Sequence, residues 1–115
     1  MVVGNAILLG WTAAIPGREK RALEQFMEIH GWFEELKAQK TITGYQDVIV
    51  APHGGDLNGF TLLTGDPAKL SELTRTDKWN DHVLRASLNL TGFGVQYATT
   101  GDAVPNLMQT WAKFI

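Results

Sequence analysis

The segment "TITGYQDVIVAPHGGDLNGFTLLTG" (41–65) decides the fold. Residues 41–52 and 57–65 are rich in β-branched, aromatic and other apolar side chains, and "PHGGD" (52–56) between them is typical of a turn. Two strand-like runs joined by such a turn form a β-hairpin. The segment therefore predicts two antiparallel strands near the middle of the chain.

A long helix is predicted before this hairpin, from Arg18 to Lys40. Apolar residues recur there at intervals of four, three, four and three positions, which is the period of an amphipathic helix. These residues are Ala22, Phe26, Ile29, Phe33 and Leu36. Most of the glutamates in the stretch lie off this stripe, so we expect the stripe to face a core.

Two further helical segments are predicted after the hairpin. Asp66 is a favourable N-cap and Pro67 suits the first helical position, so a short helix should run through Leu70 and Leu73. A second segment is expected over residues 77–90, and the following glycine ends it.

The outermost parts of the chain complete the pattern. Residues 5–13 and 92–100 are predicted strands, and Asp102 is the expected cap of a last helix over 103–115. The order is strand, helix, strand, strand, helix, strand and a C-terminal helix. A β-α-β unit repeated in this way predicts a ferredoxin-like α+β sandwich, with the helices on one face of a four-stranded antiparallel sheet.

Size and composition are those of one globular domain. The chain has 115 residues, of which 44% are hydrophobic and 19% charged, so we expect a single domain over 1–115 with its core in 5–100. The net charge is −2 and the densest basic run is "REKR" (18–21), so nucleic acid is not an expected partner. The chain has no cysteine, which excludes disulfides and thiolate chemistry.

The apolar start of the chain, "MVVGNAILLGW" (1–11), is best explained as part of the first strand. It has no basic beginning, as a signal peptide would, and it is too short to span a bilayer. No membrane association is therefore expected, and a cytoplasmic location is the expectation.

The predicted strands are apolar on both faces, although the helices can cover only one face. The first strand places Ile7, Leu9 and Trp11 on one face and Ala6, Leu8 and Gly10 on the other. A large uncovered apolar face is rare in soluble monomers. We therefore expect a homodimer in which the same face of a second copy covers it.

This layout resembles the dimeric α/β-barrel superfamily, in which two ferredoxin-like subunits pack sheet to sheet. The stretches "AIPGREKRALEQF" (14–26) and "TDKWNDHVLRA" (76–86) are similar to members of the antibiotic-biosynthesis-monooxygenase and EthD/NIPSNAP-like groups. The resemblance implies a pocket in each subunit between the sheet and the two helices. It leaves the reaction open, because the superfamily includes cofactor-free monooxygenases, haem-degrading enzymes, isomerases and proteins with no known reaction.

Two histidines are the candidate catalytic residues. His82 lies three residues after Trp79 and His30 four residues after Phe26, so each lies on the apolar flank of one of the two packing helices. A histidine there suits a base or proton shuttle, because its ordinary pKa lies near neutrality. The alternative is that both are edge residues whose nitrogens are simply satisfied by hydrogen bonds.

Aromatic side chains are the candidate lining of a pocket for a flat molecule. The predicted substrate-binding residues are Trp11, Phe26, Phe33, Tyr45, Trp79 and Tyr97. Aromatic residues at stripe positions also serve as ordinary core, and the two tyrosines suit strand positions with the hydroxyl at the rim.

Neither a metal nor a cofactor is expected. His30, His82 and Asp47 could converge, but the chain has no H-x-x-x-H or H-x-H spacing and no dinucleotide fingerprint. The sequence therefore predicts a protein that binds a small aromatic or polyketide-like molecule. It is either a cofactor-free monooxygenase or isomerase, or a non-catalytic binding or structural homodimer.

Overall fold

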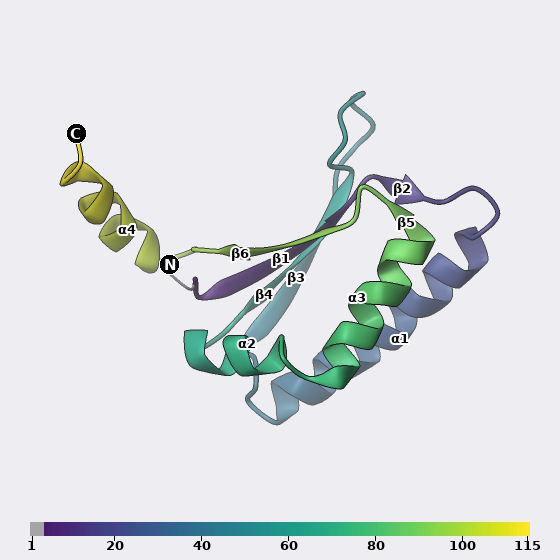
Figure 1. Ribbon diagram of the computed structural model, residues 1–115, viewed down its shortest axis with the longest axis horizontal. Helices are drawn as coiled ribbons and strands as arrows, with labels where there is room; N and C mark the ends of the chain where they lie inside the picture. The colour runs from purple at the N-terminus through teal and green to yellow at the C-terminus, as the bar shows by residue number, and fades with distance from the viewer. Residues whose placement is uncertain (1–3) are drawn as a thin grey trace.

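A computed structural model describes residues 4–115 of the chain (Figure 1). Its elements are β1 (Ala6–Trp11), β2 (Ala13–Ala14), α1 (Glu19–Ala38), β3 (Gly44–Ile49), β4 (Gly59–Thr64), α2 (Pro67–Leu73), α3 (Asp77–Asn89), β5 (Leu90–Thr91), β6 (Gly94–Ala98) and α4 (Ala103–Ala112). Every predicted element is present. The pairing of β2 with β5 was not predicted.

The main sheet has the order β3-β4-β1-β6, and all its neighbours are antiparallel. The predicted hairpin is confirmed as β3–β4, but its strands are shorter than predicted and residues 50–58 form the loop between them. Residues 41–43 are not in the strand. Thr41 and Ile42 instead donate backbone hydrogen bonds to the carbonyl of Leu36, which closes the end of α1.

Helices α1 and α3 cover one face of this sheet, and the core lies between the sheet and the helices (Figure 1). The largest fully buried side chains are Ile7, Phe33, Ile42, Leu63 and Leu70. Ile7 and Leu63 are paired across β1 and β4, so the two central strands supply the floor of the core. The fold is ferredoxin-like, as the repeated β-α-β order predicts.

Caps fix two of the helix starts. Asp66 accepts a hydrogen bond of 3.1 Å from the backbone of Lys69 and so caps α2 as predicted. Thr76 does the same for α3 through Trp79. Asp102 lies at the N-cap position of α4 as predicted, but its backbone is already helical and its side chain makes no capping hydrogen bond.

The other face of the sheet carries Leu8, Val48, Phe60 and Leu62, which are only partly buried. Figure 1 shows α4 standing away from the layers formed by the sheet, α1 and α3. None of its residues is buried, and Trp111 is 56% exposed. Both surfaces are thus uncovered in a single copy.

Within residues 4–115, none of the helices combines the length and the apolar character needed to cross a membrane.

Candidate functional site

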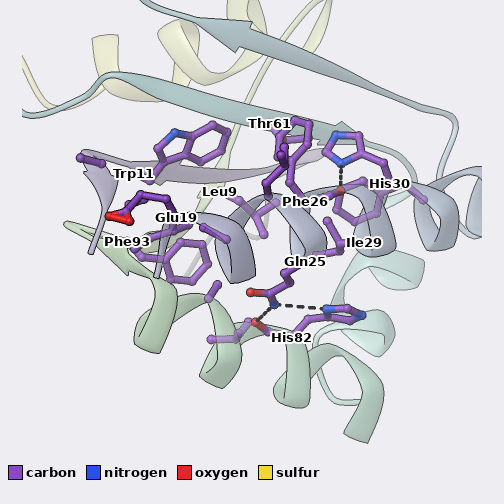
Figure 2. Close-up of a pocket in the computed structure, with 18 of the residues that line it drawn as sticks. Leu9, Trp11, Glu19, Gln25, Phe26, Ile29, His30, Thr61, His82 and Phe93 are labelled. Carbon is purple, nitrogen blue, oxygen red and sulfur yellow. Dashed lines mark hydrogen bonds between the residues drawn. The ribbon is translucent and has the colours of Figure 1, made fainter. Parts of the chain in front are cut away.

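A cavity of about 380 Å³ lies between the sheet and the two covering helices (Figure 2). Most of its wall is apolar, with Leu9 from β1, Ile29 from α1 and Val83 from α3. Leu23 and Ile49 also line the cavity and are 64% and 70% exposed, so the cavity opens to solvent on their side. An apolar cavity of this size suits a small, mainly apolar molecule.

His82 lines this cavity from α3 and is only 4% exposed. Its Nδ1 atom lies 3.4 Å from the amide nitrogen of Gln25 on α1, and its ring stacks on Trp32 with centroids 5.3 Å apart. Its Nε2 atom lies 3.7 Å from the carboxylate of Glu28. The ring thus lies against three residues of α1, namely Gln25, Glu28 and Trp32.

A chain of hydrogen-bonded polar side chains holds Gln25 in place. Arg18 donates a hydrogen bond of 3.0 Å to Asn89, and Asn89 donates one of 2.8 Å to the side-chain oxygen of Gln25. The amide nitrogen of Gln25 therefore faces His82, where it donates to the backbone carbonyl at 2.9 Å. This orientation directs a donor at Nδ1, so Nδ1 is the acceptor and Nε2 carries the proton.

Burial lowers the pKa of His82 from its ordinary value of 6.5. The nearby guanidinium of Arg85 lowers this pKa further, and the carboxylate of Glu28 partly opposes the effect. The imidazole is therefore neutral near pH 7. A neutral imidazole with an unprotonated nitrogen can act as a base.

His30 lines the same cavity from α1, on the side of the sheet (Figure 2). Its Nδ1 atom donates to the backbone carbonyl of Phe26 at 2.6 Å, and its Nε2 atom lies 2.8 Å from the Asp47 carboxylate. Thr61 donates a further hydrogen bond of 2.6 Å to Asp47. Both nitrogens of His30 thus have partners within the protein.

The predicted site residues divide into two groups. His30 and His82 line one cavity together with four of the predicted aromatic residues, namely Trp11, Phe26, Phe33 and Trp79. Tyr45 and Tyr97 are not among the lining residues. Tyr45 donates a hydrogen bond of 2.5 Å to Glu34, and the Tyr97 hydroxyl lies 2.8 Å from that of Thr74.

Sequence reasoning missed Gln25, Asn89 and Thr61. The signal for Asn89 was present, because Trp79, His82, Ala86 and Asn89 follow one another at intervals of three, four and three. All four are buried on one face of α3. Thr61 carried no such signal, since a threonine in a strand is ordinary.

Among residues 4–115 no three histidine, cysteine, aspartate or glutamate side chains are grouped as metal ligands would be. His30 and Asp47 pair with one another, whereas His82 lies beside Gln25 and Glu28. The three candidate ligands therefore do not form one set.

Similar solved structures share the fold of this chain. A dimeric ferredoxin-like protein of unknown function from Jannaschia sp. CCS1 has a TM-score of 0.61 at 14% identity, over 81% of this chain and 93% of that one. A dimeric protein of unknown function with a ferredoxin-like fold from Bacteroides fragilis NCTC 9343 has a TM-score of 0.52 at 7% identity, over 84% and 100% of the two chains. The cofactor-independent oxygenase SnoaB from Streptomyces nogalater has a TM-score of 0.49 at 11% identity, over 84% and 95%.

No protein-family model and no curated protein matches the sequence. At these identities the structural likeness establishes the fold alone. Membership of the antibiotic-biosynthesis-monooxygenase or EthD/NIPSNAP-like groups stays a prediction.

Proposed function

We propose that the protein binds a small, flat, mainly apolar molecule in the cavity and that His82 removes a proton from it without a cofactor. One observation carries the proposal: a buried, neutral imidazole lines a mainly apolar cavity. Such a cavity with few polar groups is the usual form of a small-molecule site. A pKa lowered by burial keeps the imidazole in the form that accepts protons.

The chemistry follows from the walls of the cavity. Trp11, Phe26 and Trp79 offer aromatic surface to a flat substrate. His30 lies on the other side of the cavity from His82 and can orient the substrate oxygen when its Nε2 exchanges Asp47 for the substrate (Figure 2).

Gln25 gives up its longer contact of 3.4 Å with Nδ1 of His82 and keeps the shorter one of 2.9 Å with the backbone carbonyl. Nδ1 then takes a proton from an acidic C–H or O–H group, and the aromatic system of the substrate spreads the charge. The anion then either reacts with dioxygen, so that CH2 and O2 become C=O and H2O, or regains the proton at another carbon.

A non-catalytic binding protein is the second candidate, and a specific observation favours it. The nitrogens of both histidines already face protein groups, namely Gln25 and Glu28 for His82, and Phe26 and Asp47 for His30. Satisfied polar groups of this kind are normal in protein interiors.

A bicyclic aromatic ketone with acidic C–H bonds, 2-tetralone, separates the two candidates. Binding is measured by the change in tryptophan fluorescence, since two tryptophans line the cavity. Proton removal is measured by NMR as deuterium uptake at the carbon beside the carbonyl group in D2O. We expect the protein to accelerate this uptake and His82→Gln to abolish the acceleration while binding persists.

The matched control is His53→Gln, because His53 is exposed on the β3–β4 loop and contacts only that loop. Equal acceleration by wild type and His82→Gln would reject the catalytic role. Binding with no acceleration by any of the three proteins would leave the non-catalytic candidate.

We also propose that the protein is a homodimer joined through the open face of the sheet and α4. Leu8, Phe60 and Leu62 are apolar on that face and only partly buried, and an open apolar face of a soluble protein marks an interaction site. The similar proteins from Jannaschia and Bacteroides fragilis are described as dimeric. α4 contributes no residue to the cavity. We therefore propose that its apolar side packs against a second copy of the chain.

A further inference from the structure

His82 lies between two hollows of the molecule. One is the apolar cavity described above, and the other is a polar groove on the outer side of α1 and α3, lined also by Glu28, Trp32, Lys78, Asp81 and Arg85. Among the described residues that line either hollow, His82 is the one that lines both. Its ring therefore forms part of the wall that separates them.

The two ring nitrogens have different environments. Nδ1 faces the amide of Gln25, which itself lines the apolar cavity, at 3.4 Å. Nε2 faces the groove, where the nearest carboxylate oxygen is that of Glu28 at 3.7 Å. A gap of 3.7 Å is too short for an intervening water and slightly too long for a hydrogen bond. Catalytic hydrogen bonds are often long in this way before a substrate binds.

We infer that Glu28 is a proton-transfer group, which passes protons between Nε2 of His82 and the solvent in the groove. Together the two residues form a proton relay. The purpose of this relay rests on the proposed function, because the relay gives a proton taken from the substrate a route from the apolar cavity to the solvent. The inference assigns a role to Glu28, a residue that does not line that cavity.

Protons are conserved in both directions of the relay. Nδ1 gains the proton of the substrate and the ring becomes an imidazolium. Nε2 then loses its own proton to the Glu28 carboxylate, which passes it to water, and the ring is neutral with its proton on Nδ1. Return of the Nδ1 proton to the product, with uptake of a proton at Nε2 from Glu28, restores the starting tautomer.

Arg85 is a positioning residue in this relay. Its guanidinium donates to Oε2 of Glu28, the same oxygen that lies nearest Nε2 of His82, and holds the pKa of Glu28 below its ordinary value. The carboxylate is thus ionised, and its lowered pKa favours rapid release of any proton that it accepts. It is 54% exposed, so water can take that proton. Lys78 and Asp81 are the other charged groups that act on His82 from α3.

The test measures proton exchange on the protein itself and needs no substrate. Nitrogen-15-labelled full-length protein is studied by NMR, which reports the tautomer of His82 and the rate at which its Nε2 proton exchanges with water. We expect the proton on Nε2 in the wild type. In Glu28→Gln the exchange should slow on the order of tenfold or more, because a positioned carboxylate contributes at least that much to proton transfer.

The matched control is Glu35→Gln, which removes the same charge from the same helix and the same groove but is not among the groups acting on His82. Exchange in this variant should equal that of the wild type. Exchange that is unchanged in Glu28→Gln, or slowed equally in both variants, would overturn the relay. A proton found on Nδ1 in the wild type would overturn it as well.

Deuterium uptake by 2-tetralone separates this inference from the proposed function. If the wild type gives no uptake but exchange slows only in Glu28→Gln, the proposed catalysis is rejected and the relay between His82 and Glu28 stands. If uptake depends on His82 but exchange is the same in both glutamate variants, the catalysis stands and the relay is rejected.

Discussion

Asn89 at the end of α3 donates a hydrogen bond of 2.8 Å to Gln25 on α1, and the two residues are 64 positions apart in the chain. Both side chains are buried, with exposures of 4% and 5%. The bond ties the two covering helices together at the cavity wall. It also sets which end of the Gln25 amide faces His82, so a structural contact determines the tautomer of the candidate base.

Replacing Asn89→Ala should therefore lower the free energy of unfolding. The change leaves the side-chain oxygen of Gln25 without its donor, and a buried polar atom that loses its partner costs about 1–3 kcal/mol. Urea unfolding measures the effect at one protein concentration. Asn80→Ala is the control, because Asn80 is exposed on the same helix and should change the stability little. Equal effects of the two substitutions would show that the bond contributes nothing.

The stability should fall as the pH drops below the ordinary histidine value of 6.5. Burial lowers the pKa of His82 in the folded state, so above pH 6.5 the residue is neutral in both the folded and the unfolded chain. Below pH 6.5, His82 binds a proton in the unfolded chain but not in the folded protein. The free energy of unfolding therefore decreases until the pH reaches the lowered pKa of His82 in the folded state.

Urea unfolding at several pH values above the ordinary glutamate pKa of 4.5 measures this effect, because Glu28 adds its own pH dependence below that value. We expect the slope to be smaller in His82→Gln than in the wild type. The control variant His53→Gln should keep the wild-type slope. A slope that is the same in all three proteins would show that the pKa of His82 does not change on folding.

Filling the cavity should remove binding and leave the fold intact. Ala22 lines the cavity from α1, so Ala22→Trp places an indole where a ligand would lie. We expect the affinity for 2-tetralone to fall by roughly tenfold or more, which corresponds to about 1.4 kcal/mol. Ala38→Trp is the control at the exposed end of the same helix and should bind as the wild type does. Retained affinity in Ala22→Trp would place the ligand elsewhere.

The sequence was sufficient for the fold because the periodicity of each element is strong. The stripe Phe26, Ile29, Phe33 and Leu36 identified α1, and Asp66 with Pro67 identified the start of α2. The hairpin was placed correctly but its ends were not. The strand propensity of Thr41 and Ile42 was overridden by hydrogen bonds to the end of α1, which a local pattern does not contain.

The site was only partly predictable for a similar reason. The spacing of His82 from Trp79 put its ring on a buried face, and the structure agrees. The partners of His82 come from α1, and which residues of α1 they are depends on how the two helices pack. Tyr45 and Tyr97 were chosen as aromatic strand residues, but the sheet places both outside the cavity lining. The periodicity of one helix or strand does not show which residues of another element it will contact.

The open face of the sheet should control the oligomeric state. Leu62 lies opposite Leu8 at the centre of that face, so Leu62→Glu would bury a charge in the proposed interface. We expect a dimer for the wild type and a monomer for this variant in sedimentation analysis. Leu84→Glu is the control, because Leu84 is 64% exposed on α3, away from that face. A monomeric wild type, or a dimeric Leu62→Glu variant, would contradict the proposed interface.

The apolar side of α4 should strengthen the same dimer. Val104, Met108 and Trp111 follow one another at intervals of four and three, so they lie on one side of the helix, and all three are exposed. Replacing the three residues with serine should raise the dimer dissociation constant by roughly tenfold or more, since each apolar side chain buried at an interface is worth about 1.5–3 kcal/mol.

The matched control for this prediction lies on the same helix. Asn106 and Gln109 are exposed and polar, and replacing both with serine should leave the dissociation constant unchanged. No α4 residue is buried in the single copy, so the triple variant should keep the unfolding free energy of the isolated subunit. If it unfolds more easily as a monomer but dimerises as the wild type does, α4 packs on its own subunit rather than on a second copy.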